Sequence, residues 1–117
     1  MLSREEFIEQ AYFFRVLVER AEQAMPMQEI LSSIKEEVLA TTDLPKAIDF
    51  LDIELKTEGA IAPAMARLSH YFTPFQTFVI SEAENDRGRF DLKVGLEILR
   101  REAEYRATVP SPQGLVR

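Results

Sequence analysis

Residues 11–18 read AYFFRVLV, and Arg15 is the one polar side chain in this run. The flanking segments, SREEFIEQ at 3–10 and ERAEQA at 19–24, are rich in residues that form helices. We therefore expect the run to be the middle of one long helix. At about 100° per residue, Phe7, Phe14 and Val18 share one face of that helix, with Ala11, Ala21 and Met25.

A second apolar face is predicted on the same helix, because Tyr12, Phe13 and Val16 point away from the first stripe. The helix predicted after Asp43 has the same property, since Phe50 and Ile53 point away from its inner stripe. A helix with two apolar faces must be covered on both, either by its own domain or by a partner. The sequence therefore predicts an interaction surface made by Tyr12, Phe13, Val16, Phe50 and Ile53. The alternative is a central helix that its own domain covers completely.

Helix signals recur along the rest of the chain. We expect the first helix over 4–24, a second from Pro26 or the next residue to about residue 40, and a third that starts after Asp43 and stops at Gly59. A short helix is expected at 63–68, one that starts at Pro74 and ends near 85, and a last one after Asp91. Long stretches of period-two alternation, typical of strands, are absent. The predicted fold is all-α, an irregular bundle of five to six helices.

Polar residues at the expected starts of these helices predict their caps. Ser3 and Glu6 have the spacing of a capping box, and Asp43, Thr73 and Asp91 are expected to cap the helices that follow them. Gly95 weakens the last helix but allows a close contact with another helix. The helices are expected to form a single domain over residues 1–107. Residues 108–117, with two prolines and a glycine, resemble a linker and are expected to lead into a missing downstream region.

Composition excludes several classes of function. The chain has 117 residues and no cysteine, which excludes disulfides, thiolate zinc sites, iron–sulfur clusters and cysteine nucleophiles. No apolar run is long enough to span a bilayer, and the amino terminus lacks the pattern of a secretory signal. We therefore expect a cytoplasmic protein without a membrane partner.

The distribution of charge disfavours nucleic-acid binding. The net charge is −6, and residues 1–86 hold 7 basic and 16 acidic side chains, which disfavours contact with phosphate. Residues 87–106 are mildly basic, with 6 basic and 4 acidic side chains. The pairs Glu97–Arg101 and Glu102–Arg106 have the spacing of ion pairs on a helix surface. A solvated face is therefore the preferred interpretation of this last helix.

Catalytic motifs are absent from the sequence. His70 is the only histidine, and it lies with Tyr71 in the irregular connector 60–73, where the two could line a ligand pocket. A structural role for His70 is the competing interpretation. Glu82, Glu84 and Asp86 could bind a hard cation, but the spacing of a known metal loop is missing. We predict no catalytic residue, no metal and no cofactor.

These observations favour a non-catalytic helical module for protein interaction or scaffolding, which binds another protein or associates with itself. The alternative is a small-molecule-binding or catalytic helical domain that uses the 60–73 connector around His70. Arg15 adds to the first hypothesis, because arginine is common at the centres of protein interfaces and Glu19 is its nearest partner in the sequence. The sequence does not exclude enzymatic activity, but it favours a non-catalytic role.

Overall fold

The computed structural model describes residues 4–37, 43–85, 87–88 and 90–108. Within them the chain forms six α-helices and no strand, which confirms the predicted all-α bundle of five to six helices. The helices are α1 (Arg4–Glu22), α2 (Met27–Glu37), α3 (Leu44–Glu58), α4 (Ala62–Arg67), α5 (Pro74–Glu84) and α6 (Leu92–Thr108).

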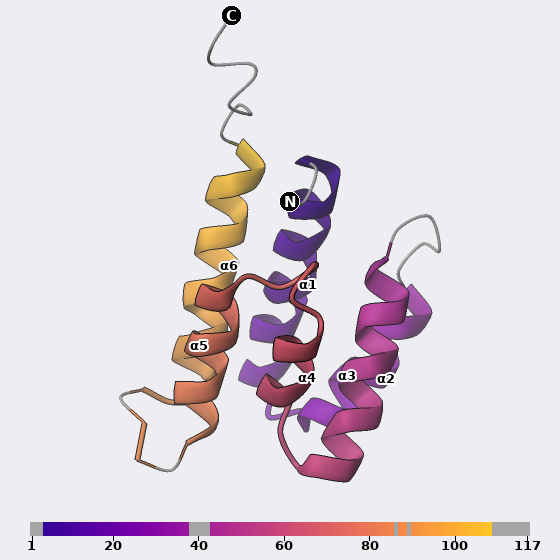
Figure 1. Ribbon diagram of the computed structural model, residues 1–117, viewed down its shortest axis with the longest axis vertical. Coiled ribbons are helices and arrows are strands. Elements are labelled where there is room, and N and C mark those ends of the chain that lie inside the picture. Colours follow the sequence, from indigo (N-terminus) through magenta and orange to yellow (C-terminus); the bar gives the residue numbers. More distant parts are fainter. Residues whose placement is uncertain (1–3, 38–42, 86, 89, 109–117) are drawn as a thin grey trace, which may run out of the picture.

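The longest helix, α1, stands in the middle of the molecule (Figure 1). On one side α6 runs antiparallel to it, and α5 packs against α6. On the other side α2 packs against α1 and carries α3. The short helix α4 contacts both α3 and α5 and so links the two sides. The helices therefore enclose one shared hydrophobic core.

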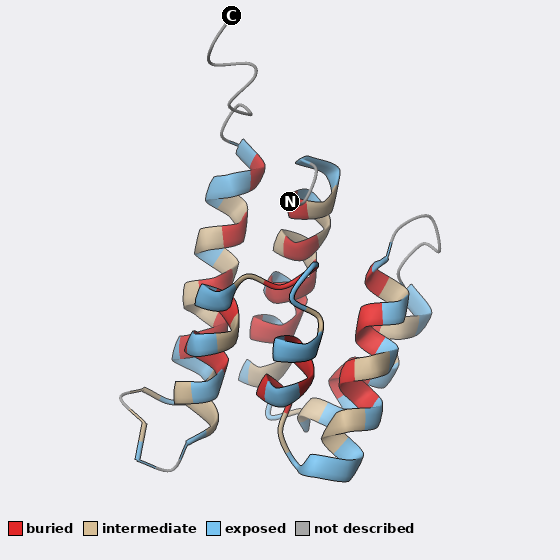
Figure 2. Cartoon of the chain, viewed as in Figure 1, coloured by how far each residue is buried: buried red, intermediate tan, exposed pale blue. Residues whose placement is uncertain are grey.

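Burial follows α1 along its length (Figure 2). Phe13, Phe14, Val16 and Leu17 are all buried. At about 100° per residue these four side chains spread over about 160° of the helix circumference, and the buried Val18 extends this arc to about 200°. Most of α1 is therefore covered by its own domain, as in the alternative of a central helix.

A buried pair of amides fastens α1 to α5. Gln76 Nε2 donates to Gln10 Oε1 at 2.9 Å, and both side chains are fully buried. Gln10 Nε2 donates to the carbonyl oxygen of Tyr71 at 2.9 Å. The backbone N–H of Thr73 donates to Gln76 Oε1 at 2.9 Å. The pair thus satisfies two backbone polar groups of the connector between α4 and α5, the carbonyl of Tyr71 and the N–H of Thr73.

Several predicted helix ends are confirmed. Thr73 caps α5 through a full capping box with Gln76, Asp91 Oδ1 accepts from the N–H of Val94 at 2.9 Å, and Gly59 ends α3 with φ 75°. Asp43 precedes α3, but the prediction of a side-chain cap there is wrong, because its carboxylate makes no cap hydrogen bond. The predicted box at Ser3 lies outside the described residues.

The outer bounds differ from the predicted ones by a few residues. α1 ends at Glu22 because Ala24, two residues before Pro26, adopts φ 62°. A right-handed helix cannot accommodate this left-handed conformation. α6 includes Thr108, the first residue of the predicted linker, and the rest of that segment lies outside the described residues. In the part of the chain that the structure describes, no helix is both long and apolar enough to cross a bilayer.

Gly95 brings α5 and α6 close together, as its position in α6 predicted. A Cβ atom at this position would lie 3.0 Å from the Cβ of Ala83 and 3.5 Å from Cγ1 of Val79. We expect Gly95→Val to destabilise the domain by about 1–3 kcal/mol through overpacking, even though glycine itself costs a helix about 1 kcal/mol. Urea denaturation would measure the change. Adding Ala83→Gly should restore part of the loss, and an unchanged midpoint for Gly95→Val would contradict the close contact.

Candidate functional site

The structure separates the residues of the predicted interaction surface. Phe13 is 1% exposed and Val16 is 5% exposed, so both belong to the core. Tyr12 and Phe50 are partly buried, whereas Ile53 is 52% exposed. The second apolar face of α1 therefore lies largely inside the domain. The residues of this predicted surface that reach solvent are Tyr12 on α1, and Phe50 and Ile53 on α3.

Arg15 is exposed, and its predicted pairing with Glu19 is not among the ion pairs of the described residues. Its guanidinium carbon instead lies 5.4 Å from the centre of the Tyr12 ring. This cation–π contact holds the arginine along the surface of α1 with its charge in water.

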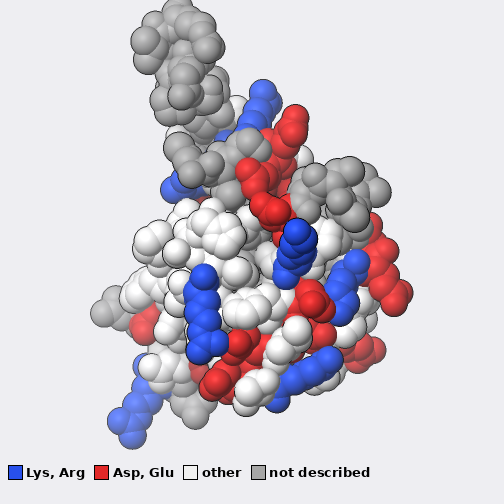
Figure 3. Space-filling model, turned by 45° about the vertical axis from the view of Figure 1, so that its right-hand side comes forward, with Lys and Arg blue, Asp and Glu red and all other residues white. Residues whose placement is uncertain are grey.

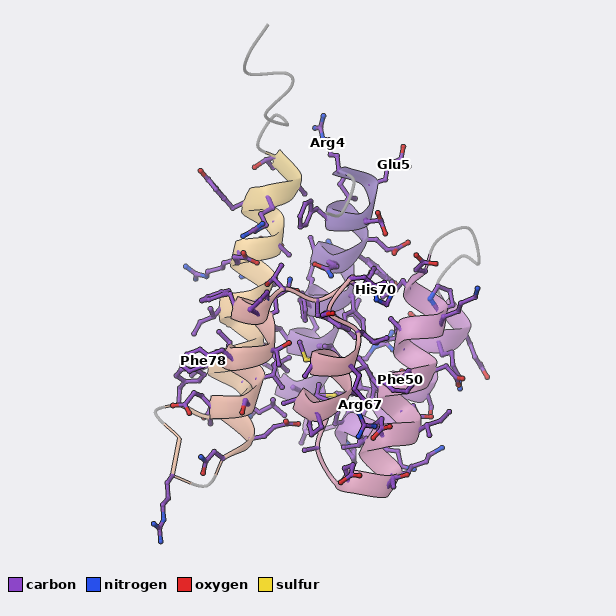
Figure 4. The ribbon with its side chains drawn as sticks, in the orientation of Figure 1. Arg4, Glu5, Phe50, Arg67, His70 and Phe78 are labelled. Carbon is purple, nitrogen blue, oxygen red and sulfur yellow. The ribbon has the colours of Figure 1, made fainter. Side chains whose placement is uncertain are left out.

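His70 and Tyr71, the predicted ligand-binding pair, lie in different environments. The histidine is exposed on the connector between α4 and α5 (Figure 4), whereas the tyrosine is 2% exposed. The Tyr71 hydroxyl donates to Glu9 Oε1 at 3.2 Å, and its ring meets Phe72 edge-on at 5.0 Å. Burial, followed by the charge of Glu9, raises the pKa of Tyr71 well above its usual value of 10.0. Tyr71 therefore remains protonated and serves as a packing residue.

Glu84, one of the three candidate cation ligands, caps a helix. Its two carboxylate oxygens accept from the backbone N–H groups of Ile61 at 2.7 Å and Ala62 at 3.0 Å, at the start of α4. Ile61 offers no polar side chain for this purpose, so the cap comes from α5. Among the described residues there is no group of three or more metal-ligating side chains, and Asp86 lies outside them.

The burial of Glu84 makes stability depend on pH. Burial raises the pKa of Glu84 above its usual value of 4.5, although the two backbone N–H groups act against this shift. The folded state therefore holds this proton more tightly, and the contribution of Glu84 to stability falls as the pH rises from 4.5 through the raised pKa. We expect the wild type to lose stability relative to Glu84→Gln between about pH 4 and about pH 7. Urea denaturation of both proteins across this range would check it, and a constant difference would contradict it.

An open groove lies between α1 and α6, with a volume of about 780 Å³. We call it the α1/α6 groove. It is lined from α1 by Arg15, Val18, Glu19 and Glu22, and from α6 by Lys93, Val94, Glu97, Ile98, Arg100 and Arg101. Valine and isoleucine side chains thus lie among charges of both signs, and Val94 is 47% exposed.

Ion pairs organise the α6 side of the α1/α6 groove. Arg100 pairs with Glu97 and also with Glu104 at 3.1 Å, while Arg101 pairs with Glu97 at 3.0 Å. The predicted pairs Glu97–Arg101 and Glu102–Arg106 are both confirmed. Hydrogen bonds from Arg100 and Arg101 lower the pKa of Glu97 to about 2. This carboxylate therefore stays ionised near neutral pH, which suits electrostatic binding better than proton transfer.

The side of the molecule where α2 and α3 come forward has a different character. Acidic and basic side chains are interspersed there (Figure 3). Ion pairs join neighbouring helices here, among them Lys35 with Asp49 at 2.9 Å and Arg67 with Glu54 at 2.7 Å. Charges of opposite sign that neutralise each other provide no continuous basic track for a phosphate backbone.

The sequence does not predict the α1/α6 groove, because the charge pattern of the last helix indicates an ordinary solvated face. The available signal was weak. Val94 and Ile98 are four residues apart on that helix and do not belong to its inner stripe, but nothing local shows which helix lies beside them. The site emerges only from the antiparallel pairing of α1 and α6.

No family of proteins, no curated protein and no solved structure matches this chain.

Proposed function

We propose that this chain is a non-catalytic protein-interaction module whose binding surface is the α1/α6 groove. The observation that carries the proposal is the composition of that groove, in which Val94 and Ile98 lie among charged side chains on an open surface. Protein interfaces commonly combine an apolar centre with a polar rim. The sequence-based expectation of a cytoplasmic location accompanies this proposal.

The two helices that form the α1/α6 groove suit a binding role. They are the longest described helices, with 19 residues in α1 and 17 in α6, and they pack on each other through buried side chains. A surface on two packed helices is held rigid before a partner arrives, which lowers the entropy cost of association. Arg15, expected from the sequence to support an interface, lines this same groove.

The alternative function, a ligand site around His70, draws no support from the geometry of the 60–73 connector. His70 faces solvent while the Tyr71 side chain is enclosed in the core, so the two side chains lie in different environments. Neither residue lines the α1/α6 groove.

Site-specific crosslinking tests the proposal. A photoreactive amino acid would replace Val94 in the groove or Ile53 on α3, in full-length protein expressed in the organism that encodes it. The two positions are nearly equally exposed, at 47% and 52%, so accessibility does not bias the comparison. We expect discrete crosslinked bands from position 94 and much weaker ones from position 53. Equal bands, bands from position 53 alone, or none from position 94 would overturn this placement of the interface.

A further inference from the structure

We infer that the α1/α6 groove binds a second copy of this chain, giving a dimer with two-fold symmetry. The inference rests on the proposed interaction function and adds the identity of the partner. It comes from the charged side chains of α1 and α6, which lie at matching positions along the two helix axes. We call the position along these axes the height.

Contacts at one end of the helix pair set their register. Arg4 Nε donates to the carbonyl oxygen of Ala107 at 3.1 Å, and the guanidinium of Arg106 lies 5.6 Å from the centre of the Phe7 ring. From Arg4 to Arg15, α1 rises about 16 Å, and from Ala107 back to Glu97, α6 spans about 15 Å. Arg15 and Glu97 therefore lie at nearly the same height.

A second level repeats this pattern with the signs exchanged. Counting from the same contact, Glu19 lies about 22 Å along α1 and Lys93 about 21 Å along α6. The first level thus has a base on α1 and an acid on α6, and the second has an acid on α1 and a base on α6. All four side chains line the α1/α6 groove.

A two-fold axis along the groove turns this pattern into complementarity. Such an axis exchanges α1 and α6 between the two copies but leaves heights along the helices unchanged. Arg15 then faces Glu97 of the partner subunit, and Glu19 faces Lys93 of the partner subunit. Because the symmetry repeats each contact, the interface contains four such pairs.

Apolar side chains support the same arrangement. Val94, which is 47% exposed, and the half-buried Ile98 lie in the groove beside these charges. In the dimer each of these side chains would be covered by the facing copy, which removes apolar surface from water. The helices α1 and α6 of two copies would form a four-helix arrangement.

The alternation of sign favours a second copy over a partner of uniform charge. Arg100 and Arg101 also line the groove, but a uniformly acidic segment laid along it would still meet Glu97 at the first level and Glu19 at the second. A uniformly basic segment would meet Arg15 and Lys93. A second copy related by the axis meets an opposite charge at both levels, because the pattern is its own complement.

Charge exchange within the full-length chain tests the inference. Sedimentation velocity would measure association of the wild type, of Glu19→Lys and of Lys93→Glu at concentrations up to about 1 mM. We expect the wild type to dimerise and each variant alone to associate about tenfold more weakly, since its two facing pairs become repulsive. An equimolar mixture of the two variants should associate like the wild type, because every facing pair then joins a lysine with a glutamate.

Matched controls separate this effect from a change of net charge. Glu29→Lys on α2 and Lys46→Glu on α3 alter exposed side chains outside the groove, and should associate like the wild type. Circular dichroism would show that all variants remain folded. A wild type that stays monomeric throughout, or a mixture no stronger than its components, would overturn the inference. If position 94 then crosslinks to a protein of another mass, the interaction function stands with a different partner; if it crosslinks to nothing, both proposals fail.

Discussion

Phe13→Ala should destabilise the domain by about 3–5 kcal/mol, the range expected when a large aromatic side chain is removed from a packed core. Phe13 is 1% exposed and its ring lies 5.4 Å from that of Phe14. Truncation removes buried apolar contacts and leaves a cavity that the surrounding helices fill only partly. Urea denaturation followed by circular dichroism would measure the loss, which approaches the whole stability of many small domains.

Ile53→Ala provides the matched control. Ile53 was grouped with Phe13 in the surface predicted from the sequence, yet it is 52% exposed on α3. We expect its truncation to change stability by no more than about 0.5 kcal/mol. Similar losses for the two variants would contradict the assignment of Phe13 to the core and of Ile53 to the surface.

Removal of one member of the buried amide pair should be almost as costly. Gln76→Leu leaves the buried Gln10 Oε1 and the half-buried backbone N–H of Thr73 without their partners. A buried polar group left unpaired costs about 1–3 kcal/mol and a half-buried one somewhat less, so we expect a loss of about 2–5 kcal/mol. Thermal and urea denaturation would measure this loss.

The double variant Gln10→Leu with Gln76→Leu separates pairing from packing. Each single substitution leaves the other amide with an unpaired group, whereas the double substitution removes both amides. We therefore expect its loss to fall short of the summed single losses by about 1–2 kcal/mol. Strict additivity would show that the two side chains do not stabilise each other.

Local signals were enough to predict the helices and many of their ends. Thr73 before Pro74, Gly59 after an apolar stripe and Asp91 before the last helix each act within a few residues. Such caps depend on the backbone immediately beside them, so the helix ends that they make can be predicted from short patterns in the sequence. Asp43 is the exception, because its position before α3 does not by itself aim its carboxylate at the helix N–H groups.

Contacts between distant segments could not be predicted in the same way. The periodicity of α1 showed that two faces need cover, but not that Phe13 and Val16 are covered within the domain. Glu84 is the last residue of α5, where a carboxylate opposes the helix dipole. Its purpose becomes clear only when the start of α4 lies against it. The α1/α6 groove likewise depends on a pairing between the first and last helices.

The hydrogen bond from Arg4 to Ala107 joins residues 103 positions apart, and it has a consequence for synthesis of the protein. A ribosome adds about 5–20 residues per second, so the helix that covers α1 emerges roughly 5–20 s after α1 itself. During that interval the phenylalanines of the nascent amino-terminal segment lack their final neighbours. Packing of α1 against α6 therefore begins only after α6 has emerged, and release of a chain truncated before α6 would yield an aggregation-prone product.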